Sequence, residues 1–165
     1  HHFQISLAQE NAALPSFMRF GGNTAYIEGW GLYAEAVMKQ YLPLEGQLGT
    51  LQMRLMRAAR AFLDPMINLG QITPQDAQRF LEQEVVLSES MAKQEADRYS
   101  FRAPGQATAY FYGYERQLAI RARAEMALRD RFDELSYHDF IVSQGLLPPE
   151  VLEQAVMDDY VAKRK

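Results

Sequence analysis

Residues 23–41 read NTAYIEGWGLYAEAVMKQY, and this stretch decides the fold class. Its apolar side chains recur at intervals of three and four residues, the spacing of one face of an α-helix. Asn23 or Thr24 is placed to cap the first turn, and Pro43 follows the last turn. The stretch therefore predicts one amphipathic helix that ends before Pro43.

The rest of the chain repeats this pattern of long helical segments separated by sparse glycine and proline. The strongest local signal is Thr73-Pro74-Gln75-Asp76, in which a hydroxyl cap, a proline and a carboxylate mark a helix start. Because no strand-like alternation persists, we predict an all-α fold and a single domain over residues 1–165. Further helices are predicted over residues 45–68, 88–102, 106–131 and 136–145, and after Pro148-Pro149.

The composition fits one sizeable core and excludes several kinds of site. The chain has 165 residues, of which 48% are hydrophobic, and it contains no cysteine. Disulfides, thiolate metal sites and a cysteine nucleophile are therefore excluded. The net charge is only -4 and no segment is strongly basic, so a nucleic acid is not expected as a partner.

The sequence shows no transmembrane segment, because no apolar run approaches the length that spans a bilayer. The first residue is histidine rather than methionine, which leads us to expect an upstream portion, a tag or a processing event. The sequence leaves open a periplasmic or envelope location and a cytoplasmic one. It also leaves the oligomeric state open.

His1, His2 and Glu28 form the first candidate chemical site. Neutral imidazoles and a carboxylate from a later helix are ligands of catalytic zinc sites, which leave one position open for water. Two adjacent N-terminal histidines are also typical of an expression-tag remnant. Glu28 by itself is an ordinary carboxylate that needs a partner if it is buried.

Several motifs along the chain resemble the bacterial DUF885 family. They are HHFQ at residues 1–4, YIEGWGLYAE at 26–35, RAAR at 57–60 with Asp64, PGQA at 104–107 with Tyr110 and Gly113, and His138-Asp139 with Gly145 and Pro148. Members of that family are zincin-like proteins that are regarded as relatives of the gluzincin metallopeptidases. The resemblance implies that this chain is the multi-helix, C-terminal portion of such a peptidase.

On that resemblance, His1 matches a metal-binding histidine and Glu28 matches the glutamate that completes a zinc site. His2 is the adjacent alternative ligand, and we favour His1. The family also has a preceding His-Glu pair, which supplies another ligand and the general base, and this pair is absent from the chain. We therefore expect these residues alone to be inactive, with a peptide substrate and the missing N-terminal portion of the same protein as partners.

Four further residues are candidates for roles around such a site. Tyr110 is the candidate for stabilising an oxyanion, because gluzincins commonly place a phenol near the scissile carbonyl. Gln106 and Arg121 are candidates for contacting substrate, and Glu35 for orienting a ligand histidine. The alternatives are a core tyrosine with a satisfied hydroxyl, a helix-surface ion pair for Arg121, and a salt bridge between Glu35 and an arginine.

Other polar residues are assigned structural roles. His138 is left outside the site, because a hydrogen bond between a loop and a helix explains it equally well. Arg57, Arg60 and Asp64 lie three and four residues apart, which predicts an ion-pair network within one helix.

A non-catalytic helical module is the competing function. In that case Trp30, Tyr33 and the tyrosine-rich segment pack against another domain or a partner protein, and Glu28 belongs to a structural ion pair. The sequence does not distinguish an endopeptidase from an exopeptidase.

Overall fold

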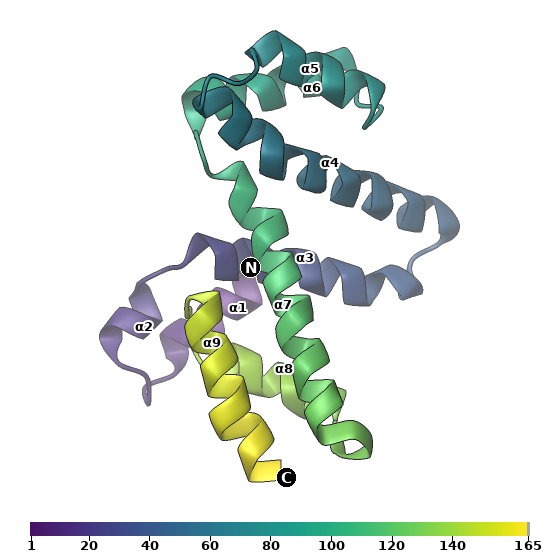
Figure 1. Ribbon diagram of the computed structural model, residues 1–165. Coiled ribbons are helices and arrows are strands. Elements are labelled where there is room, and N and C mark those ends of the chain that lie inside the picture. Colours follow the sequence, from purple (N-terminus) through teal and green to yellow (C-terminus); the bar gives the residue numbers. More distant parts are fainter. Residues whose placement is uncertain (165) are drawn as a thin grey trace. The chain divides into compact units, whose positions relative to one another are not determined.

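The computed structural model describes residues 1–164, and helices are the only regular elements in that range (Figure 1). The all-α prediction is confirmed. The α-helices are α1 (His2–Glu10), α2 (Ser16–Phe20), α3 (Thr24–Met38), α4 (Leu44–Asn68), α5 (Pro74–Gln83), α6 (Glu89–Asp97), α7 (Ala107–Leu128), α8 (Glu134–Ser143) and α9 (Pro149–Ala155). Short 3₁₀ or π turns extend α3, α6, α7 and α9, at Lys39–Tyr41, Arg98–Arg102, Arg129–Arg131, Val156–Val161 and Ala162–Arg164.

The local start signals determine where two helices begin. The side chain of Asn23 accepts a hydrogen bond from the backbone N–H of Tyr26, so Asn23 caps α3. Thr73 and Asp76 form a reciprocal capping box at the start of α5. Both helix starts are confirmed.

Three features differ from the sequence expectations. α1 and α2 were not predicted, because α1 buries only Gln4 and Ala8 and α2 buries no residue. α8 begins at Glu134 rather than at residue 136, because the side chain of Asp133 accepts from the N–H of Ser136 and caps the helix earlier. An aspartate cap three residues before Ser136 overrides the hydroxyl cap.

The chain divides into two compact units whose boundaries fall inside α3 and α7. The first unit comprises residues 1–33 and the chain from Gly113 onward, and the second comprises Ala34–Tyr112. Two such units can be parts of one domain, so the single-domain assignment stays a prediction.

The core of the first unit is formed by α3, α7, α8 and the C-terminal helix. Two of its buried tyrosines donate their hydroxyls to backbone carbonyls: Tyr26 to Ile141 O at 3.1 Å and Tyr160 to Asp133 O at 3.0 Å. The other fully buried members include Ile120, Ala124, Leu128, Tyr137, Leu152 and Val156.

The core of the second unit is formed by one face of α4 with α5, α6 and the start of α7. Its buried members include Met56, Ala59, Leu63, Ala77, Leu81, Val85, Ala92, Tyr99 and Ala107. Each unit therefore has its own apolar centre, and each is described separately below.

Candidate functional site

His1 and Glu28 meet in the first unit, as the zinc-site hypothesis requires. The Nε2 atom of His1 lies 3.1 Å from Oε2 of Glu28. His1 precedes the first turn of α1, and Glu28 lies in the second turn of α3. The glutamate side chain is 18% exposed and the histidine 46%, so the pair lies at the surface with one face open to solvent.

Two glycines of α3 have different roles beside this pair. A Cβ atom at Gly31 would lie 2.7 Å from Cε1 and 3.0 Å from Nε2 of His1, so the imidazole ring packs directly on the glycine. A Cβ at Gly29 would instead collide with the backbone of Gly113 in α7. Gly29 thus permits close helix packing, whereas Gly31 leaves room for the histidine ring.

The spacing of the pair is suitable for two ligands of one zinc ion. Ligand atoms bound at about 2.0–2.2 Å to a tetrahedral zinc lie about 3.3–3.6 Å apart, close to the separation of Nε2 and Oε2. His2, by contrast, lines a shallow hollow with Phe3, Ser6, Leu7 and Glu10. Within residues 1–164, no group of three or more His, Cys, Asp or Glu side chains is arranged to hold a metal ion.

A second polar cluster of the same unit joins α3, α7 and α8 through Tyr33. Arg121 donates to the hydroxyl of Tyr33 at 2.8 Å, and this hydroxyl lies 2.7 Å from Nε2 of His138. Since the phenol oxygen accepts from Arg121, its own proton is available to His138. The hydrogen bond then requires an unprotonated Nε2 on His138.

Burial sets the protonation behaviour of this cluster. It lowers the pKa of His138 below its ordinary value, against the opposing effect of Glu134. Burial likewise raises the pKa of the Tyr33 hydroxyl, despite the hydrogen bond from Arg121. A neutral histidine and a protonated phenol are the forms that the observed hydrogen bond needs.

Arg121 is fully engaged by this cluster. Its Nε donates to Glu125 at 2.7 Å and its Nη1 to Glu134 at 2.7 Å, in addition to Tyr33. Burial opposes the charged form of Arg121, but these hydrogen bonds raise its pKa above the ordinary value. The surface ion pair expected for Arg121 is confirmed, and a contact with substrate would have to replace one of these partners.

Tyr110 and Gln106 lie together in the second unit, where they share a partner that the sequence did not indicate. Arg98 donates to Oε1 of Gln106 at 2.8 Å and to the hydroxyl of Tyr110 at 3.3 Å. The guanidinium of Arg60 lies 4.1 Å from the centre of the Tyr110 ring. Because both oxygens accept from Arg98, the phenol proton and the amide N–H groups remain able to donate.

The ion-pair network predicted within α4 is wrong. Arg57 pairs with Glu35 at 3.2 Å and Arg60 with Glu95 at 3.2 Å, both outside α4. Asp64 is completely buried and accepts from the backbone N–H groups of residues 105 and 107, as well as from Asn68. The arginine salt bridge expected as the plainer role of Glu35 is confirmed.

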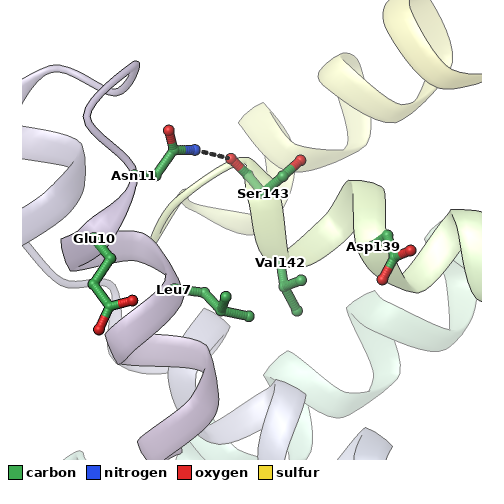
Figure 2. A pocket seen from close by; sticks show the side chains of 6 residues that line it. All are labelled: Leu7, Glu10, Asn11, Asp139, Val142 and Ser143. Atoms are coloured by element: carbon green, nitrogen blue, oxygen red, sulfur yellow. Dashed lines mark hydrogen bonds between the residues drawn. The ribbon is translucent and has the colours of Figure 1, made fainter.

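A cleft between α1 and α8 is lined by Leu7, Glu10, Asn11, Asp139, Val142 and Ser143 (Figure 2). Figure 2 shows Leu7 and Val142 pointing toward one another across it, with the two carboxylates on opposite sides. Asn11 bridges the two helices by donating to Ser143 O at 3.3 Å. The cleft adjoins the hollow beside His2, because Leu7 and Glu10 line both.

A comparison with protein families shows to which family the chain belongs. The sequence model of the family described as "Bacterial protein of unknown function (DUF885)" matches residues 1–156. The chain belongs to the DUF885 family. No curated protein is significantly similar to it.

Two solved structures resemble this DUF885 chain. One is described as a "putative lipoprotein" from Colwellia psychrerythraea, with 34% identity and a TM-score of 0.91 over 99% of this chain and 28% of that one. The other is a "putative lipoprotein of unknown function" from Shewanella oneidensis, with 22% identity and a TM-score of 0.80 over 96% of this chain and 29% of that one. The DUF885 chain thus spans less than a third of each protein. None of its described helices is both long and apolar enough to cross a bilayer.

Proposed function

We propose that this DUF885 chain supplies two ligands, His1 and Glu28, to a zinc site in a longer peptide hydrolase. The observation that carries the proposal is the 3.1 Å approach of His1 Nε2 to Glu28 Oε2, with Gly31 leaving room for the imidazole ring. Catalytic zinc sites use three protein ligands, so a third ligand and the general base would come from outside these residues. The solved relatives support a longer protein, because each is more than three times as long as the segment it shares with this chain.

A bound zinc ion would supply an activated water and polarise the scissile carbonyl. Within this chain, Glu28 and His1 would hold the ion, and His2 would lie beside the site on α1. Within the second unit, we propose that Tyr110 and Gln106 contact substrate through the phenol and amide groups that remain able to donate beside Arg98. Arg98 supports both roles, because its hydrogen bonds orient the two side chains.

The hypothesis is tested by peptide hydrolysis with the full-length protein, purified without a histidine tag. We expect hydrolysis that a chelator abolishes and added zinc restores, and that Glu28→Ala removes. Hydrolysis that survives chelation, or no hydrolysis after zinc is added, would contradict the proposal. The lipoprotein descriptions of the two relatives further suggest the cell envelope as the location, which fractionation of the same protein checks.

The exposed apolar face of α4 favours a second candidate, a non-catalytic interaction module. Leu44 is 80% exposed, Leu48 70% and Leu55 50%, and two adjoining hollows extend from Leu48 to Phe62 along the helix. The face containing Tyr33 is not available for this purpose, because that side chain is 2% exposed. In this case the His1–Glu28 contact is a structural ion pair. Leu48→Asp is then expected to abolish binding of the partner protein, and Glu28→Ala is not.

A further inference from the structure

The surface along α1 connects the proposed metal site with two carboxylates that have no assigned role. The hollow beside His2 and the cleft between α1 and α8 share Leu7 and Glu10, so the two hollows adjoin along α1. We define this α1 groove by His2, Phe3, Leu7, Glu10, Asp139 and Val142. The groove starts one residue from His1, the proposed zinc ligand.

The floor of the groove is apolar, and one carboxylate stands on each side of it. Phe3 is 77% exposed and Leu7 39%, and Leu7 faces Val142 across the cleft (Figure 2). Glu10 and Asp139 stand on either side of this contact. Neither carboxylate belongs to an ion pair among residues 1–164. No lysine or arginine lines the groove.

We propose that the α1 groove binds a segment of substrate peptide that carries a lysine or an arginine, a specificity that rests on the zinc-hydrolase function proposed above. The methylene stem of such a side chain packs on Leu7 and Val142, while its charged end approaches Glu10 on one side or Asp139 on the other. Charge complementarity selects this occupant, because two carboxylates without basic partners would repel an acidic peptide.

The length of α1 predicts where the basic residue lies in the substrate. Eight residues separate His2 from Glu10, which corresponds to about 12 Å along the helix axis. An extended peptide advances about 3.3–3.6 Å per residue, so about three or four residues span that distance. The favoured lysine or arginine is therefore expected three or four positions from the bond that is hydrolysed.

The experiment measures binding of a fluorescein-labelled nonapeptide of alanine and serine with two lysines, using the full-length protein. We expect the double variant Glu10→Gln, Asp139→Asn to bind the peptide at least tenfold more weakly than the wild type. The matched control is Glu115→Gln, Asp158→Asn, which makes the same change in charge at exposed positions outside the groove. This control should bind like the wild type, and raised salt should weaken the wild-type interaction.

Equal loss in both double variants would show attraction by the overall negative charge and would overturn the proposal. Equal binding of a peptide in which glutamates replace the lysines would overturn it as well. A zinc titration of the same proteins separates this inference from the proposed function. If the protein binds zinc but the groove shows no selectivity for the lysine peptide, only the groove proposal is contradicted. If the groove is selective but the protein does not bind zinc, the zinc-hydrolase proposal is contradicted and a binding site for basic peptides remains.

Discussion

The two units surround their key carboxylates differently. In the second unit, Asp64 is completely buried, and its two oxygens accept from two backbone N–H groups and from Asn68. In the first unit, Glu28 is partly exposed and pairs with His1, whose own side chain is 46% exposed. A fully satisfied buried carboxylate stabilises the fold, whereas a carboxylate at an open surface can take a further ligand. Asp64 therefore has a structural role, and Glu28 has the exposure that its proposed metal-binding role requires.

The largest expected effect is the loss of stability on changing Asp64. Asp64→Asn replaces an acceptor with a donor that faces backbone N–H groups, and we expect the free energy of unfolding to fall by about 3–5 kcal/mol. Glu28→Gln should lower it by less than about 1 kcal/mol, because the pair is open to solvent. Urea denaturation measures both values. Equal losses would remove the distinction between the two carboxylates.

The next largest effect is the difference in stability loss between alanine substitutions at two nearby glycines of α3, Gly29 and Gly31. Gly29→Ala forces α3 away from the Gly113 backbone, and we expect a loss of about 1–3 kcal/mol. Gly31→Ala meets only the imidazole of His1, which can rotate away, so stability should stay within about 1 kcal/mol. Thermal unfolding of the two variants gives the comparison. A large loss for Gly31→Ala would show that the ring is part of the packing and not a movable ligand.

A smaller effect is expected at the capping box of the second unit. Thr73→Ala removes the acceptor for the N–H of Asp76, which should cost about 1 kcal/mol in urea denaturation. Thr24→Ala is the control, since the cap of α3 is provided by Asn23, and it should change stability by less than about 0.5 kcal/mol. Similar costs for both would mean that the box does not stabilise the unit.

The smallest effect is the pH dependence that His138 contributes to the first unit. Its pKa is lowered in the folded state, so the unfolded chain binds the proton more readily. Its contribution to stability is therefore present above about pH 6.5 and is lost as the pH falls through the lower, folded-state value. NMR titration of the ring and unfolding at several pH values test this. His138→Gln should flatten that part of the profile, and an unchanged slope would contradict the assignment.

The sequence predicted the parts of the fold that local signals control. The spacing of residues 23–41 and the Thr73–Asp76 motif placed α3 and the start of α5, because helix periodicity and capping depend on neighbouring residues. α1 was missed because only two of its residues are buried.

Partners distant in sequence were not predictable from such signals. Asp64 bonds to residues 41 and 43 positions away, although spacing alone suggested partners within its own helix. Arg98 and Tyr33 were likewise overlooked, since tertiary packing brings them to Tyr110 and His138. Ligand chemistry alone gave only a weak reason to pair His1 with Glu28, and the family resemblance strengthened it, because no periodic signal links residues 1 and 28.

The most direct test of the central claim is the zinc content of the full-length protein, purified without a histidine tag. We compare the wild type with Glu28→Gln and with Glu95→Gln, which alters a carboxylate of the second unit that pairs with Arg60. We expect about one zinc per molecule in the wild type and in Glu95→Gln, and loss of zinc in Glu28→Gln. A wild type that stays free of zinc after zinc is added, or a Glu28→Gln variant that retains it, would contradict the account.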